Sequence, residues 1–214
     1  MDGTQILFVW QTPTLFMTRR PAISVIGDAS LIPDSEKYVF ARTLGCSLVE
    51  NGYRIITGGL GGVMEAASAG AHASPHYREG DVIGMLPGAD PNEANQYVDI
   101  ALATGIDHAR NFIVANSDAV IAIGGGAGTL SELSYAWVMH RLILAYECPH
   151  PGPDAGQFSD WSGIVAGKRL DDKIRYPEIP EDRIYGIRTA DEALLLLKTL
   201  LPRYVHRPMR AGKR

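Results

Sequence analysis

The stretch of residues 118–132, which reads DAVIAIGGGAGTLSE, limits the folds open to this chain more than any other part of the sequence. Its apolar run at 119–123, rich in β-branched residues, predicts a buried strand, and the residues after Thr129 are typical of a helix. A strand, a glycine turn and a helix in this order place free N–H groups at the carboxyl end of the strand. Such a turn can be purely structural, but its N–H groups and the helix dipole favour an anion. We therefore predict a phosphate-binding turn formed by Gly124, Gly125, Gly126, Gly128 and Thr129.

Strand and helix patterns alternate along the rest of the chain. Strands are predicted at residues 22–27, 53–57, 81–86, 97–103, 119–123, 142–146 and 184–187. Helices are predicted after Asp34, at 63–72, at 108–116, after Thr129 and at 190–201, with Asp34 and Thr189 as N-caps. An irregular loop is predicted at 148–162. This alternation predicts one α/β domain over 21–202, with a doubly wound, mostly parallel sheet of about seven strands.

The two ends of the chain fall outside this domain. Residues 1–20 are interpreted as an N-terminal extension or arm, in which 6–10 could form an edge strand. Residues 203–214 are interpreted as a basic tail. Neither end is given a function.

Several turns of the predicted sheet contain glycine or small polar residues. They span residues 27–30, 58–62, 104–105 and 124–129, and each follows a predicted strand. In a doubly wound sheet, ligands bind outside the carboxyl ends of the strands. The candidate binding residues of the first three turns are Gly27, Asp28, Ser30, Gly59, Gly61, Gly62 and Thr104. Asp28 and Ser30 also suit an Asx-type turn, so a structural role is the alternative for both.

The glycine clusters do not match the common nucleotide-binding motifs. Thr129 stands where the dinucleotide fingerprint has its third glycine, although Glu147 keeps that alternative open as a ribose-binding acid. No Gly-Lys-Ser/Thr follows either cluster, and no Gly-x-Ser-x-Gly elbow supplies a serine nucleophile. Cys148 and His150 beside Glu147 lack a second pair of ligands, so no metal site is predicted.

The net charge and the cysteine content indicate which partners and which cellular compartment to expect. A formal net charge of −4 argues against a nucleic-acid surface. The sequence has only 2 cysteines, so no disulfide framework is expected and a reducing cytoplasm is the default. The apolar run at 6–10 is too short to span a membrane and lacks the basic flank of a signal peptide. We therefore expect a cytoplasmic protein without a nucleic-acid or membrane partner.

The glycine turns resemble those of the SLOG superfamily, a Rossmann-like group formerly described as possible lysine decarboxylases. Residues 124–132 match its Pro-Gly-Gly-x-Gly-Thr-x-x-Glu hallmark except at the first position, and residues 59–64, ending in Met64, resemble its second motif. Arg110 and Asn111 stand where the family has an Arg-Lys or Arg-Asn pair. The resemblance covers about residues 22–147 and implies a Rossmann-like fold whose site includes Met64, Arg110, Asn111 and Glu132.

Two branches of this superfamily imply different functions. In the LONELY GUY branch, which hydrolyses the N-glycosidic bond of nucleoside 5′-monophosphates, the resemblance implies that Glu132 and Arg110 are catalytic. The sequence departs from that branch at Gly124, Ser131 and Asn111, where the branch has Pro, an acid and Lys. These residues and the GMLPG segment at 84–88 are more similar to the molybdenum-cofactor carrier proteins.

The resemblance therefore implies a carrier or storage protein for a phosphorylated ligand, either a molybdenum cofactor or a nucleotide. A phosphoribohydrolase is the alternative, and a nucleotide-sensing module is a weaker one. The resemblance also implies a homo-oligomer, either a dimer or a tetramer, and no cofactor is expected to be required for folding. Glu132 has a structural alternative as a first-turn acid of its helix, and Trp137 and Met139 are expected in the core or an interface.

Overall fold

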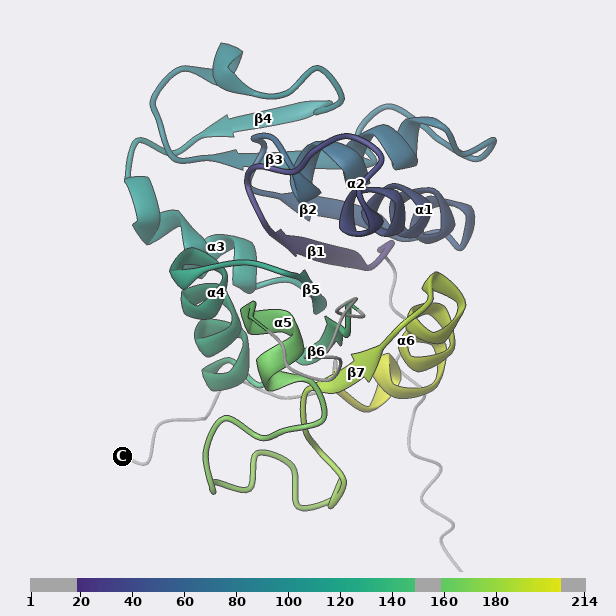
Figure 1. Ribbon diagram of the computed structural model, residues 1–214, viewed down its shortest axis with the longest axis vertical. Coiled ribbons are helices and arrows are strands. Elements are labelled where there is room, and N and C mark those ends of the chain that lie inside the picture. The colour runs from purple at the N-terminus through teal and green to yellow at the C-terminus, as the bar shows by residue number, and fades with distance from the viewer. Residues whose placement is uncertain (1–18, 149–158, 205–214) are drawn as a thin grey trace, which may run out of the picture.

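The computed structural model of the chain describes residues 19–148 and 159–204. Its centre is an open sheet of seven strands in the order β4-β3-β2-β1-β5-β6-β7 (Figure 1). The strands are β1 (Ala22–Gly27), β2 (Arg54–Thr57), β3 (Val82–Leu86), β4 (Ile100–Ala103), β5 (Ala119–Ile123), β6 (Leu142–Tyr146) and β7 (Tyr185–Ile187). Every neighbouring pair is parallel. The predicted α/β class with a doubly wound sheet is confirmed, and the sheet is parallel throughout.

Helices cover both faces of this sheet. They are α1 (Glu36–Glu50), α2 (Val63–His72), α3 (Asn111–Ala115), α4 (Ala127–Val138), α5 (Trp161–Val165) and α6 (Ala190–Tyr204), with short 3₁₀ turns η1 (Pro91–Glu93) and η2 (Asp107–Arg110). Helices α1, α2 and α6 pack on one face, and α3, α4 and α5 pack on the other (Figure 1). The result is a three-layer α/β/α sandwich.

Strand β5 shows why the sequence gives this layering. All five of its residues are buried, as expected for a central strand of a parallel sheet. Because side chains alternate along a strand, Ala119, Ile121 and Ile123 pack into the core beneath α1, α2 and α6. Val120 and Ala122 pack into the opposite core, which includes Trp137. Trp137 is therefore a core residue, as one of its two predicted roles required.

Some predicted boundaries were wrong. Asp34 is not an N-cap, because its φ of 64° is left-handed, and Ser35 precedes the first helical residue instead. Strand β4 begins at Ile100 rather than at Tyr97, because Val98 N–H donates to the carbonyl of Asn95 in a turn. The helix predicted at 108–116 is divided into η2 and α3.

The C-terminal part also differs in detail. Helix α5 begins inside the segment predicted as irregular, and the carboxylate of Asp160 caps it by accepting from Gly163 N–H. Thr189 Oγ1 accepts from Glu192 N–H at 3.2 Å, as expected of a cap. Helix α6 continues to Tyr204, so Arg203 belongs to the helix and pairs with Glu181 at 2.8 Å.

The remaining predictions about the ends fall on residues 1–18 and 205–214, which lie outside the described part of the chain. Within the described part, no helix is long and apolar enough to cross a membrane.

Candidate functional site

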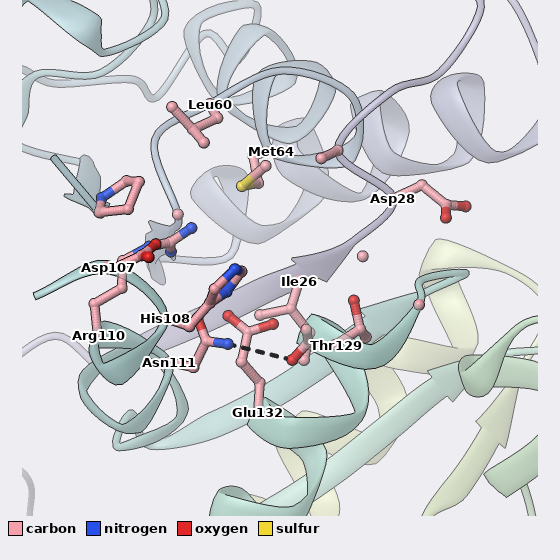
Figure 2. A pocket seen from close by; sticks show the side chains of 16 residues that line it. Ile26, Asp28, Leu60, Met64, Asp107, His108, Arg110, Asn111, Thr129 and Glu132 are labelled. Atoms are coloured by element: carbon pink, nitrogen blue, oxygen red, sulfur yellow. Dashed lines mark hydrogen bonds between the residues drawn. The ribbon is translucent and has the colours of Figure 1, made fainter.

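A pocket of about 430 Å³ lies at the carboxyl edge of the sheet, where the turns after β1, β2, β3 and β5 meet (Figure 2). Its lining residues are Ile26, Gly27, Asp28, Ala29, Gly58, Leu60, Met64, Pro87, Asp107, His108, Arg110, Asn111, Gly126, Gly128, Thr129 and Glu132. The pocket is therefore at the edge where the strand-end turns were predicted to converge.

The first half of the glycine turn after β5 is held by the fold itself. Gly124 N–H donates to Ser162 Oγ at 2.8 Å, and its carbonyl accepts from Ser162 N–H at 3.2 Å. Gly125 N–H donates to Asp28 Oδ1 at 3.0 Å, and its carbonyl accepts from Trp161 N–H at 3.1 Å. Both glycines have left-handed φ values, 69° and 96°. Conformation and packing therefore explain glycine at these two positions.

The second half of the turn is different. A Cβ at Gly126 or Gly128 would have no protein atom within 4 Å, and neither glycine has a left-handed φ. The fold alone does not require glycine at these positions. Among the described residues, none accepts a hydrogen bond from the N–H groups of Ala127, Gly128 and Thr129 at the start of α4. Free donors with open space above them at a helix N-terminus suit an anion, and we call these three N–H groups the cradle.

Arg110 provides a cation in the same pocket. Arg110 is 9% exposed. Its Nε and Nη1 atoms are buried, and no atom of the described residues accepts a hydrogen bond from them. Gly58 makes room for it, because a Cβ there would lie 2.4 Å from Nη1. Burial lowers the pKa of Arg110, and the charges of Glu132 and Asp107 partly offset this. A buried guanidinium with unpaired donors facing a pocket is suited to bind an anion that comes from outside.

Glu132 lies on α4 below the cradle (Figure 2). Its side chain is 7% exposed, and burial raises its pKa from 4.5 to about 7, against the opposing charge of Arg110. The structural alternative of a first-turn acid does not fit, because Glu132 is buried and lies beyond the first turn of α4. At neutral pH this carboxyl group exists in both protonation states, so it can donate or accept a hydrogen bond.

Glu132 is expected to make the stability of the protein depend on pH. The folded protein keeps a proton that the unfolded chain releases above about pH 4.5. The free energy of unfolding should therefore fall as pH rises from about 4.5 to about 7, by up to about 3 kcal/mol. Urea titrations of the wild type and Glu132→Gln across this range check the effect. The variant should lose this part of the pH dependence, and identical profiles would contradict the assignment.

Asn111 and Ser131 form a hydrogen-bonded pair beside the pocket. Asn111 Nδ2 donates to Ser131 Oγ at 2.8 Å, and Ser131 Oγ donates to the carbonyl of Gly128 at 2.7 Å. The pair ties the start of α3 to the first turn of α4. Two of the three positions at which the sequence departs from the LONELY GUY pattern are thus in direct contact with each other.

The structure brings together most of the predicted site residues. Those that line the pocket are Gly27, Asp28, Met64, Arg110, Asn111, Gly126, Gly128, Thr129 and Glu132. Those that do not line it are Ser30, Gly59, Gly61, Gly62, Thr104, Gly124 and Gly125. Thr104 Oγ1 instead donates to the carbonyl of Leu86 at 2.7 Å, and Gly62 allows a close approach to the carbonyl of Asp28.

Sequence reasoning missed other lining residues, including Gly58, Leu60, Pro87, Asp107 and His108. Gly58 and Leu60 lie inside the turn predicted at 58–62, so counting every residue of that turn would have found them. Pro87, Asp107 and His108 lie within one to three residues of a predicted strand end or turn, so extending the strand-edge rule by that distance would have included them. Within residues 19–148 and 159–204, no group of three or more His, Cys, Asp or Glu residues could hold a metal ion.

Comparison with known proteins shows which family the chain resembles. Residues 20–170 match the model of the SLOG cluster4 family. A protein of Archaeoglobus fulgidus is 43% identical over 128 residues, which are 59% of this chain and 80% of that protein.

Two solved structures are similar over most of their length. The molybdenum cofactor binding protein of Rippkaea orientalis is 27% identical, with a TM-score of 0.66, covering 86% of this chain and 99% of that one. The molybdenum cofactor carrier protein of Chlamydomonas reinhardtii is 26% identical, with a TM-score of 0.62 and the same coverage of both chains.

Proposed function

Because the chain belongs to the SLOG cluster4 family, we propose that it binds a phosphorylated small molecule in this pocket and acts as its carrier or storage protein. The ligand is a molybdenum cofactor or a nucleotide. Similarity to two proteins named for binding or carrying the molybdenum cofactor supports the first of these.

One observation carries the proposal. The free N–H groups of Ala127, Gly128 and Thr129 share a pocket with the unpaired guanidinium of Arg110. Backbone N–H groups at a helix N-terminus combined with an arginine are a common donor set for phosphate. Glycine at position 126, where the fold does not need it, lets a phosphate approach the backbone.

The remainder of the pocket suits the rest of such a ligand. Ile26, Leu60 and Met64 offer apolar surface, and Asn111 and Glu132 offer polar groups. A volume of about 430 Å³ is within the range of small-molecule sites. In this arrangement the terminal phosphate of the ligand lies on the start of α4. The pterin ring of a molybdenum cofactor, or the base of a nucleotide, lies against the apolar residues.

A phosphoribohydrolase is the second candidate, and Glu132 is the observation that favours it. A carboxyl group with a pKa near 7, buried beside a cation, can stabilise positive charge on a ribose ring and position water. Asn111 and Ser131 favour the carrier, because they satisfy each other where the hydrolase branch has charged residues. We therefore place the carrier first.

A chromatographic assay with AMP separates the two functions. We expect purified protein to bind AMP without releasing adenine, because the pocket holds the phosphate without completing the chemistry. Glu132→Gln is the matched control, since it keeps the size of the side chain and removes its charge. Adenine released by the wild type and not by this variant would establish a glycosidase and contradict the carrier function.

A further inference from the structure

The Asp28 carboxylate occupies an anion position of the glycine turn. Its Oδ1 accepts from Gly125 N–H at 3.0 Å, and its Oδ2 lies 2.9 Å from Lys37 Nζ. A backbone N–H group and an ammonium are together the kind of donor set that holds a phosphate oxygen. Figure 2 shows Asp28 turned away from Arg110 and Glu132. The carboxylate of Asp28 therefore occupies the place where Gly125 N–H and Lys37 could otherwise hold a phosphate oxygen.

Lys37, whose positive charge balances Asp28, also pairs with a second carboxylate. Lys37 Nζ also lies 2.8 Å from Asp160 Oδ2, so one ammonium serves two carboxylates. Burial would lower the pKa of Lys37, but its hydrogen bonds to Asp160 and Asp28 raise it. The lysine therefore stays charged, and the three side chains together keep a negative charge next to Gly125. Asp160 also accepts from Gly163 N–H and Ser162 Oγ, which fixes this arrangement in place.

The two halves of the turn therefore differ in what they offer a ligand. Ala127, Gly128 and Thr129 present free N–H groups, whereas the N–H groups of Gly124 and Gly125 are already bonded. One phosphate group can use the free half. A second phosphate group that extended along the turn would lack donors and would meet the carboxylate of Asp28.

We propose that Asp28 is a specificity-determining residue that restricts the ligand to phosphomonoesters and excludes diphosphates and dinucleotides. This inference rests on the proposed function, because it concerns the same cradle at the start of α4. Repulsion between like charges is the discriminating element, and the occupied N–H of Gly125 adds to it.

Calorimetric binding of AMP and ADP to the wild type and to Asp28→Ala tests this specificity. We expect the wild type to bind AMP at least about tenfold more tightly than ADP. In Asp28→Ala the preference should fall to within about threefold, because Gly125 N–H and Lys37 become available to a second phosphate. Inorganic phosphate and pyrophosphate form a second pair of probes that needs no recognition of the base.

Asp160→Asn is the matched control. It removes a carboxylate from the same ammonium but leaves the contact between Asp28 and Gly125, so it should keep the wild-type preference. Asp28→Asn keeps an acceptor for Gly125 N–H and removes only the charge. It provides a second test if Asp28→Ala does not fold, and its preference should also fall.

The possible outcomes distinguish a failure of the role of Asp28 from a failure of the proposed function. Equal affinity of the wild type for AMP and ADP, or an undiminished preference in both Asp28 variants, would overturn the role of Asp28 and leave the phosphate cradle intact. Failure of the folded wild type to bind either pair of probes would overturn the proposed function, and the role of Asp28 with it.

Discussion

Replacing Gly126 or Gly128 with valine is expected to abolish binding of phosphate ligands and to leave the protein folded. A Cβ at either position meets no protein atom within 4 Å, so the new side chain projects into the space that the phosphate would occupy. For Gly128→Val the free energy of unfolding should change by less than about 1 kcal/mol, because Gly128 lies inside α4 and valine is no worse than glycine in a helix. Gly126 is the N-cap of α4, where glycine is preferred to valine, so Gly126→Val should lose about 1 kcal/mol and still fold. Calorimetry with AMP and urea denaturation measure the two effects separately.

Gly125→Ala is the contrasting control. Its φ of 96° is left-handed, and a Cβ there would lie 2.2 Å from Thr129 Oγ1. This variant should lose about 1–3 kcal/mol of stability, because the fold itself requires glycine at this position. If Gly126→Val and Gly128→Val kept wild-type affinity, the anion cradle at the start of α4 would be wrong.

Replacing Arg110 with methionine is expected to weaken phosphate binding by about 1.5–3 kcal/mol, which is roughly tenfold to 150-fold in Kd. The same change should not destabilise the unliganded protein. It removes a buried cation whose Nε and Nη1 have no acceptor among the described residues, and methionine keeps most of the aliphatic volume. Weaker binding without a loss of stability distinguishes a ligand-binding arginine from a structural one.

Titration calorimetry and thermal unfolding of the same preparations measure both quantities. Arg188→Met is a suitable control, because Arg188 is exposed and pairs with Glu147 away from the pocket. It should leave affinity unchanged. Wild-type affinity in Arg110→Met would place the anion elsewhere in the pocket, and a large loss of stability would make Arg110 a structural residue.

Much of the fold could be predicted because its signals are local. Runs such as residues 119–123, followed directly by glycine, mark a buried parallel strand and its turn within a few residues. The sheet, the carboxyl ends of its strands and the position of the glycine turn were therefore predicted correctly. Helix α5 was missed because a five-residue helix next to a segment rich in proline and glycine has too little periodicity to detect.

The internal division of the glycine turn could not be predicted in this way. It depends on Asp28 and Ser162, which bond to Gly125 and Gly124 from 97 and 38 residues away along the chain. The sequence shows that four glycines are present, but only tertiary contacts decide which two the fold needs. The burial of Arg110 likewise depends on Gly58, which no local pattern connects with it.

The order of the strands has a consequence for the way the protein folds. Strand β1 pairs with β5, so residues near opposite ends of a long intervening segment must meet before the pocket exists. Closing such a long loop is entropically unfavourable, and contacts of this kind form slowly. We therefore expect the pocket to be complete only after β1 and β5 have paired, and a ligand that fills it to bind the folded chain. Its binding free energy is added to the stability of the whole molecule, so a loaded chain resists unfolding better than an empty one.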